Sequence, residues 1–209
     1  GNNIFLNGGT DARIQLGSGG SGANTVGNDT VHIRGDGDSM KLMAAANGEY
    51  VFENNGTTHM TIDANGHITK PLQPAFQVVP ASNSDNENMT SGDTLVFGTE
   101  RFDQNGDFAS NTFTAPVTGK YQLNMNIRTG QLDIDAVYTL FQVETSNKSY
   151  QNIQATTSLD QDPAYWTFNI NVLADMDAND TAICKYYQNG GASQVDLNVE
   201  SYFTGYLVC

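Results

Sequence analysis

The residues of this chain that could do chemistry are mostly carboxylates, and the densest group of them lies at positions 175–180. The sequence there reads Asp-Met-Asp-Ala-Asn-Asp, which begins like the calcium-binding loop of an EF-hand. However, Asp180 stands where that loop needs glycine, and Tyr186 stands where it needs a bidentate glutamate. The pattern therefore excludes an EF-hand. It leaves a polar hairpin turn, which is the favoured interpretation, or a looser surface calcium site made by Asp175, Asp177 and Asp180.

A second pair of carboxylates, Asp160 and Asp162, precedes a segment in which apolar and polar residues alternate. Trp166 begins the apolar series of this segment, and the other members are Phe168, Ile170 and Val172. Because side chains alternate between the two faces of a strand, we predict that Trp166 faces the interior and Tyr165 faces outward. An outward tyrosine can stack on a sugar ring beside such carboxylates. A polar turn is the simpler interpretation of Asp160 and Asp162 themselves.

No catalytic arrangement can be recognised in the sequence. The chain has no G-x-S-x-G elbow, no H-E-x-x-H motif and no phosphate-binding glycine loop. All three histidines precede residue 70, so no Ser-His or Cys-His pair can form within the later part; they are His32, His59 and His67. Glycosidase-like carboxylate pairs stay open, because their separations do not follow from sequence. We expect a non-catalytic protein whose histidines face solvent rather than holding a metal or anion on a symmetry axis.

The net charge of −14, from nine Lys and Arg against 23 Asp and Glu, argues against two classes of partner. Nucleic acids and anionic membrane surfaces both bind through clustered cations, so neither is expected here. No apolar run reaches the length of a membrane span, and we expect no membrane insertion. The 21 Gly, the low charged fraction of 15% and the many β-branched and aromatic residues predict an all-β protein. Whether the two cysteines, Cys184 and Cys209, form a disulfide stays open.

The composition changes near residue 70, which divides the chain into residues 1–70 and 71–209. In the first part, turn dipeptides such as Asn65-Gly66 interrupt very short apolar segments. Strands of three or four residues carry too little apolar surface to build a core within one chain of this length. We therefore expect residues 1–70 to form a β-rich trimeric shaft, in which each chain covers the apolar faces of its neighbours.

The second part, residues 71–209, has longer strands with a clean alternation of apolar and polar residues. In segment 121–127, for example, the odd positions are apolar and the even positions are polar. This period of two is typical of a strand with one buried face. Several such strands without a helical segment predict an antiparallel β-sandwich.

Three motifs in residues 74–209 resemble the globular head of complement C1q, a jelly-roll trimer related to tumour necrosis factor. The first is the strand Pro74–Val78, and the second is an Asn-Gly turn at Asn105 followed by F-T-x-P-x-x-G-x-Y at Phe113–Tyr121. The third is S-x-F-x-G-x-L at Ser201–Leu207. The resemblance implies an antiparallel jelly-roll head. Three large side chains of these motifs are expected in its interior, namely Tyr121, Phe203 and Tyr206.

Residues 60–71 resemble the distal shaft of a bacteriophage tail fibre, in which two strands around an Asn-Gly turn precede a proline and a globular tip. Together the two resemblances imply a homotrimeric, non-catalytic receptor-binding tip, part of the virion and extracellular when it acts. Its implied partners are upstream tail proteins and a bacterial surface receptor, either a glycan, which is favoured, or an outer-membrane protein. The alternatives are a secreted C1q-like recognition or signalling protein and, less favoured, a polysaccharide-degrading tailspike.

The two acidic groups bracket one predicted strand, so they must lie at its opposite ends. Recognition chemistry belongs on loops, because the strands are needed for packing. We predict receptor binding by Asp160, Asp162 and Tyr165. No cofactor is required, although a calcium ion could bridge carboxylates to an anionic glycan.

Overall fold

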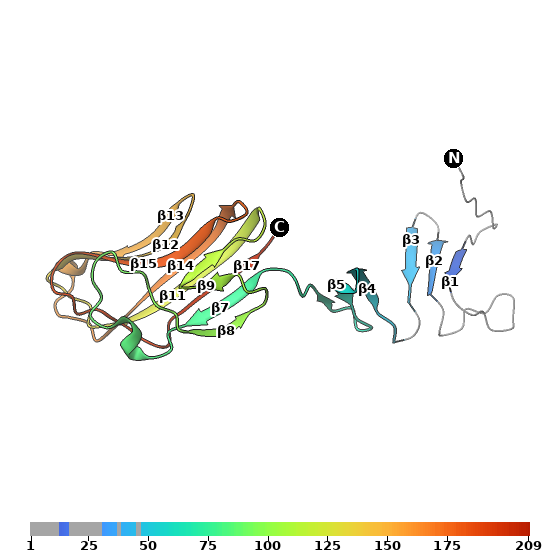
Figure 1. The fold of residues 1–209 in the computed structure, drawn as a ribbon. Coiled ribbons are helices and arrows are strands. Elements are labelled where there is room, and N and C mark those ends of the chain that lie inside the picture. The colour runs from blue at the N-terminus through green and yellow to red at the C-terminus, as the bar shows by residue number, and fades with distance from the viewer. Residues whose placement is uncertain (1–12, 17–30, 37–38, 45–46) are drawn as a thin grey trace. The chain divides into compact units, whose positions relative to one another are not determined.

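The structure is a computed structural model that describes residues 13–16, 31–36, 39–44 and 47–209 (Figure 1). The chain divides into two compact units, residues 1–71 and residues 72–209, and we call the second unit the head. Strands and two short 3-10 helices are the regular elements of the described ranges, so the prediction of an all-β protein is confirmed. Within these ranges no helix is long and apolar enough to cross a membrane.

The strands described in the first unit form two antiparallel three-stranded sheets. One sheet contains β1 (Arg13–Leu16), β2 (Val31–Asp36) and β3 (Ser39–Met43). The other contains β4 (Tyr50–Asn54), β5 (Thr57–Ile62) and β6 (Ile68–Thr69). β5 and β6 are the strands predicted around Asn65-Gly66. Gly66 has a φ of 86°, a backbone conformation that glycine adopts more easily than other residues.

Several apolar side chains of the first unit are exposed in the single chain. Their exposed fractions are 48% for Leu42, 42% for Val51, 46% for Phe52 and 61% for Ile68. A sheet normally buries its apolar face against a second layer of structure. The trimeric shaft, in which neighbouring chains would cover these side chains, stays a prediction.

The head is built from two antiparallel sheets that pack face to face (Figure 1). The first sheet has the order β13 (Ser149–Gln154), β12 (Ala136–Thr145), β15 (Thr181–Gly190), β10 (Thr112–Thr114) and β9 (Phe108–Ala109). The second has the order β14 (Tyr165–Met176), β11 (Gly119–Gly130), β17 (Tyr202–Leu207), β7 (Ala75–Val79) and β8 (Thr99–Asp103). The short β16 (Asp196–Leu197) also pairs with β11, and the 3-10 helices are η1 (Asn83–Asn86) and η2 (Thr156–Ser158).

The core lies between the two sheets and is rich in aromatic rings. The Phe76 ring stands at its centre, with ring centroids at 4.7 Å for Phe113, 5.1 Å for Phe203 and 5.3 Å for Phe108. Each large apolar side chain buried in this way contributes roughly 1.5–3 kcal/mol. The alternation read in segment 121–127 is confirmed, because four side chains of β11 are buried: Tyr121, Leu123, Met125 and Ile127.

The F-T-x-P-x-x-G-x-Y motif forms the corner between β10 and β11. The ring centroids of Phe113 and Tyr121 lie 5.4 Å apart across this corner. The Tyr121 hydroxyl donates a hydrogen bond of 2.7 Å to the carbonyl oxygen of Val117, and burial raises the pKa of Tyr121. A Cβ on Gly119 would lie 2.6 Å from the carbonyl oxygen of Cys209, so this close approach requires glycine.

The two ends of the head have different loops, and we define them by the chain. The near end is the one at Leu72–Pro74, and the far end is opposite. The N–H of Leu207, at the end of β17, donates to the carbonyl oxygen of Pro74 at 3.0 Å. β17 ends beside the start of β11, where Gly119 lies opposite Met176 of β14. Tyr165, at the other end of β14, is therefore at the far end, and the two acidic groups lie at opposite ends as predicted.

Two placements made from the sequence need correction. Tyr206 is 48% exposed rather than buried, because Phe203 and Gly205 face the core and the alternation of the strand turns Tyr206 outward. Trp166 packs against the core but is only partly buried, because it lies near the start of the edge strand β14. The interior placement of Tyr121 and Phe203 is confirmed.

Candidate functional site

Four loops meet at the far end of the head and enclose a cleft of about 270 Å³. They connect β7 to β8, β11 to β12, β13 to β14, and β15 to β17. The polar residues that line the cleft are Asn83, Glu87, Gln131, Tyr165, Asp196 and Asn198. Because each loop contributes, the cleft collects side chains that are far apart in the sequence.

Tyr165 is the aromatic surface of this cleft. Its side chain is 61% exposed and stands at the start of β14, facing outward as predicted. The guanidinium carbon of Arg128 lies 4.4 Å from the centroid of the Tyr165 ring. A cation over an aromatic face is attracted by the ring, so this contact favours the observed orientation of Tyr165. Nowhere in the described part of the chain does a carboxylate pair with this guanidinium.

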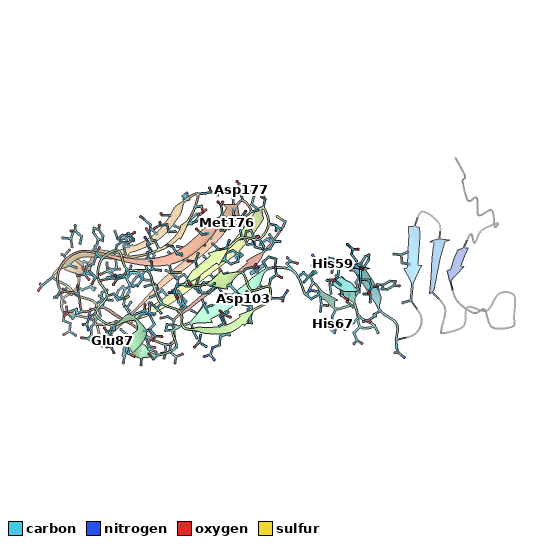
Figure 2. The ribbon with its side chains drawn as sticks, in the orientation of Figure 1. His59, His67, Glu87, Asp103, Met176 and Asp177 are labelled. Carbon is cyan, nitrogen blue, oxygen red and sulfur yellow. The ribbon has the colours of Figure 1, made fainter. Side chains whose placement is uncertain are left out.

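Two carboxylates of the cleft differ in their partners. Asp196 is held in place, because one oxygen accepts the N–H of Asn88 and the other accepts the side-chain amide of Gln131, each at 2.8 Å. Glu87 follows η1, and Figure 2 shows it at the end of the head away from Asp177. Glu87 is exposed and has no hydrogen bond or ion pair to any described residue. Its carboxylate is therefore available to a ligand.

Two asparagines of the cleft are oriented by the backbone. The amide oxygen of Asn83 accepts the N–H of Val199, and that of Asn198 accepts the N–H of Glu200, both at 3.0 Å. An asparagine side chain has one acceptor oxygen and one donor nitrogen. Because these hydrogen bonds use the amide oxygens, the Nδ2 groups of Asn83 and Asn198 are left as hydrogen-bond donors for a ligand.

Asp162, one of the predicted receptor-binding residues, is engaged within the protein. One of its oxygens accepts the N–H of Ile134 at 3.0 Å, and the other accepts the side-chain amide of Gln194 at 2.9 Å. The Ile134 hydrogen bond first and the Gln194 hydrogen bond second lower the pKa of Asp162. Asp160 is exposed, and neither Asp160 nor Asp162 lines the cleft that contains Tyr165.

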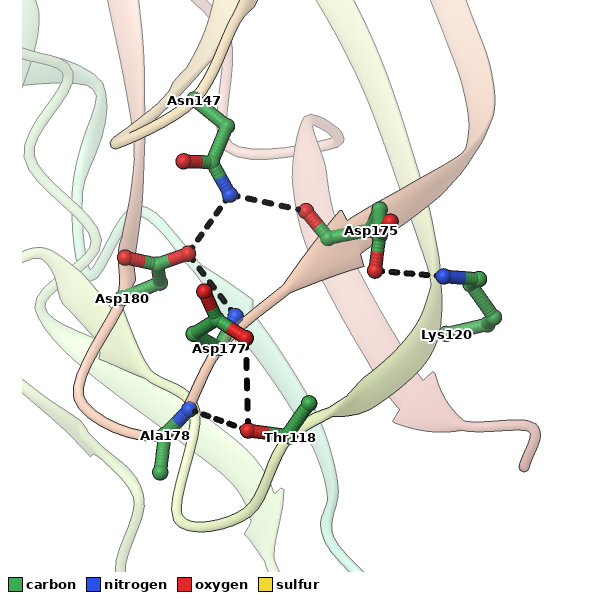
Figure 3. A network of polar contacts seen from close by, with 7 residues as sticks. All are labelled: Thr118, Lys120, Asn147, Asp175, Asp177, Ala178 and Asp180. Carbon is green, nitrogen blue, oxygen red and sulfur yellow. Dashed lines mark hydrogen bonds and ion pairs between the residues drawn. The ribbon is translucent and has the colours of Figure 1, made fainter.

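The acidic segment 175–180 forms a hydrogen-bonded turn at the near end (Figure 3). One oxygen of Asp180 accepts the N–H of Asp177 at 2.8 Å and the side-chain amide of Asn147 at 2.6 Å. The Thr118 hydroxyl accepts the N–H of Ala178 at 3.1 Å. The favoured interpretation of this segment as a polar hairpin turn agrees with these bonds. Asn179 occupies the left-handed region at a φ of 75°.

The three carboxylates of this turn have separate partners. Asp175 pairs with the Lys120 ammonium at 2.5 Å, whereas Asp177 accepts the Thr118 hydroxyl at 3.4 Å and Asp180 faces Asn147. No group of three or more His, Cys, Asp or Glu side chains is placed to hold a metal ion in the described part of the chain. The calcium site predicted at Asp175, Asp177 and Asp180 is therefore not formed within one chain.

The histidines and cysteines form no site among the described residues. His59 and His67 are exposed in the single chain, and the side chain of His32 lies outside the described residues. The ring of His67 bonds the carboxylate of Asp63 at 2.8 Å. Cys184 is buried, which raises the pKa of its thiol, and Cys209 is exposed, so the two thiols are free rather than paired.

Sequence reasoning found Tyr165 in the cleft but missed the residues around it. Glu87 and Asn83 belong to a loop that looks like any other polar connection, and Asp196 stands alone in sequence. The available signal was topological: in an antiparallel sandwich, alternate loops share one end. Counting strands from Pro74 would have grouped these loops, but the short β9, β10 and β16 are hard to recognise from sequence.

The comparisons with known proteins agree with this architecture. No protein-family model and no curated protein matches the sequence. Among solved structures, the globular domain of a zebrafish complement 1qA protein matches with a TM-score of 0.50 and 14% sequence identity, covering 66% of this chain and 98% of that one. The head has a C1q-like fold. This likeness confirms the jelly-roll architecture that the three motifs implied, and at this identity it carries the fold alone.

Proposed function

We propose that this protein is the homotrimeric receptor-binding tip of a phage tail fibre, which attaches the virion to a bacterial surface glycan without catalysis. The observation that carries the proposal is the far-end cleft, where four loops place Tyr165, Glu87 and two asparagines around one space. The near end is where the chain enters the head, so the far end is the one left for a receptor.

The first unit supports the fibre assignment. Its strands are short, its sheets have three strands each, and apolar side chains such as Phe52 and Ile68 are exposed in one chain. Three chains wound together would cover these side chains. Trimerisation would also present three clefts to one cell surface, and the effective concentration of the second and third sites then turns weak binding into firm attachment.

Binding of the labelled full-length chain to a panel of bacterial strains tests this proposal. We expect binding to a subset of strains, and we expect periodate, which oxidises sugar diols, to abolish it. Tyr165→Ala should weaken binding, and Tyr206→Ala is the matched control, because Tyr206 is also an exposed tyrosine but does not line the cleft. Loss of binding after protease treatment of the cells, but not after periodate, would identify an outer-membrane protein as the receptor instead.

A secreted recognition protein built on the same C1q-like fold is the second candidate. Such a protein would use the same C1q-like head on a different stalk. The strain panel separates the two candidates, because a protein that binds none of the bacteria is not a phage attachment tip. Release of reducing ends from purified capsular polysaccharide would instead support the polysaccharide-degrading alternative.

A further inference from the structure

We infer that the far-end cleft takes a single sugar ring without an acidic group, held between the Tyr165 ring and the Glu87 carboxylate. This inference rests on the proposed function and adds the class of ligand. The volume fits one ring: clefts for drug-sized ligands measure about 300–1,000 Å³. At about 270 Å³, this cleft lies just below that range and matches one sugar ring.

The hydrogen-bonding groups of the cleft match sugar hydroxyls. A hydroxyl can donate one hydrogen bond and accept others, so it needs acceptors and donors side by side. Glu87 offers two acceptor oxygens that no described residue occupies. Asn83 and Asn198 offer Nδ2 donors, since their amide oxygens are bound to the backbone. These donors are fixed before the ligand arrives, which lowers the entropy cost of binding.

The aromatic surface is fixed as well. Arg128 covers one face of the Tyr165 ring, and the side chain is still 61% exposed. The apolar C–H face of a pyranose packs on such a ring without needing a charge. Tyr165 therefore supplies the packing surface, and the polar residues supply the hydrogen bonds.

The charge of the cleft decides which sugars are accepted. Among the described residues that line it, two are carboxylates, Glu87 and Asp196, and none is lysine or arginine. The Arg128 guanidinium on the Tyr165 ring offsets one of these two charges, which leaves a net negative charge at the cleft. Like charges at short range repel strongly where water is partly excluded. An acidic sugar or a sugar phosphate is therefore disfavoured at this cleft, whereas a neutral or amino sugar is accepted.

The inference differs from one expectation drawn from the sequence. A calcium ion bridging carboxylates to an anionic glycan would place the acidic ligand at the negative groups. The carboxylates of segment 175–180 have partners of their own at the near end, and no metal-binding group is formed in the described ranges. The cleft instead uses its unpartnered carboxylate directly as a hydrogen-bond acceptor.

Ligand-observed NMR titration of the full-length chain tests the inference with matched pairs of sugars. The probes are glucose, glucuronate and glucose 6-phosphate, together with galactose and galacturonate, because each pair shares a ring and differs in charge. We expect at least one neutral sugar to bind, and its acidic counterpart to bind at least tenfold more weakly. Equal or tighter binding of the acidic member would overturn the inference, and so would the absence of binding by every sugar.

Variants locate the binding in the cleft. Glu87→Gln keeps the size of the side chain and removes its charge, so it should weaken neutral-sugar binding about tenfold, the effect of a hydrogen bond to a charged group. The same variant should reduce the difference in affinity between a neutral sugar and its acidic counterpart. Glu100→Gln is the matched control, because Glu100 is exposed on β8 and does not line the cleft. An unchanged preference in Glu87→Gln would show that the sugar binds elsewhere.

The outcome can be separated from that of the proposed function. If the chain binds bacteria in a periodate-sensitive manner but prefers acidic sugars, the attachment role stands and the inferred ligand class is wrong. If the chain binds neutral sugars but no bacterial strain, the cleft is a sugar site and the phage attachment role is wrong.

Discussion

The Asp162 carboxylate accepts the backbone N–H of Ile134 at 3.0 Å, and this bond joins two loops at the far end of the head. Its second oxygen accepts the Gln194 amide from a third loop. Both bonds favour the charged carboxylate and lower the pKa of Asp162 from its ordinary value of 3.8. Asp162 is therefore a residue that positions loops around the cleft.

Replacement of Asp162 by alanine should lower the melting temperature at neutral pH. A carboxylate whose pKa is lower in the folded than in the unfolded state stabilises the fold above its unfolded pKa, and this contribution is lost as the pH falls through the folded value. The difference between wild type and Asp162→Ala should therefore shrink below pH 3.8. Thermal melts over a pH series measure it, and Asp160→Ala is the control, since Asp160 is exposed and outside this network. A pH-independent difference would contradict the charge-based explanation.

Trp166 and Phe168 share one face of β14 but should differ in their contributions to stability. Phe168 is 1% exposed and lies 4.7 Å from the ring centroid of Phe141, whereas Trp166 is only partly buried. Truncating a fully buried aromatic side chain costs about 3–5 kcal/mol, so we expect that range for Phe168→Ala and less than about 3 kcal/mol for Trp166→Ala. Urea denaturation measures both values. An equal or larger cost for Trp166→Ala would show that other contacts bury it.

Gly205→Ala should destabilise the head by overpacking the core. A Cβ at this position would lie 2.7 Å from Leu123 Cδ2 and 2.8 Å from Phe76 Cε1. Forcing extra atoms into a packed core costs about 1–3 kcal/mol. Gly130→Ala is the matched control, because its Cβ would meet only the carbonyl oxygen of Ala164, at 3.7 Å. The two free energies of unfolding should differ clearly, and similar values would mean that the core relaxes around the added methyl group.

Much of the fold of the head could be predicted from the sequence, because short segments of the chain already indicate which side chains face the core. The alternation in segment 121–127 and the S-x-F-x-G-x-L motif each report which residues face the core. Gly205 of that motif has a physical reason that the sequence could not supply, namely the close approach of Phe76 and Leu123. The size of Tyr206 predicts burial, but its parity relative to Phe203 turns it outward, and the parity decides its exposure.

The candidate site could be predicted only in part, because it depends on strand register. Tyr165 was recognisable from its parity on β14, and its neighbour in space, Arg128, comes from β11, where Arg128 lies opposite Thr167. Glu87 enters from the loop after β7. The closeness of Asp160 and Asp162 to Tyr165 in the sequence led to their prediction as binding residues. The local sequence does not show that Asp162 accepts a hydrogen bond from Ile134, which comes from another loop.

Calcium should have little effect on the isolated chain. The carboxylates of Asp175, Asp177 and Asp180 bond Lys120, Thr118 and Asn147 respectively, and they do not form a metal-holding group in the described part of the chain. Calcium needs six to eight oxygens at short range, which this turn does not assemble. We expect the melting temperature to be the same in millimolar calcium and in chelator. A rise of several degrees with calcium, lost in Asp180→Ala, would contradict this arrangement.

The final prediction concerns assembly through the first unit. Exposed apolar side chains such as Phe52 and Ile68 lack a second layer in one chain, and burial of a side chain of this kind contributes roughly 1.5–3 kcal/mol. Three copies would multiply that gain, so the 209-residue chain should sediment at about three times the 22.5 kDa of one chain and resist dissociation. The double variant Phe52→Ser and Ile68→Ser should dissociate at a higher protein concentration. Val137→Ser, which changes an exposed residue of the head, is the control for surface polarity alone. A folded, stable monomer of the unmodified chain at micromolar concentration would refute the trimer, because the exposed apolar residues would then need no partner chains.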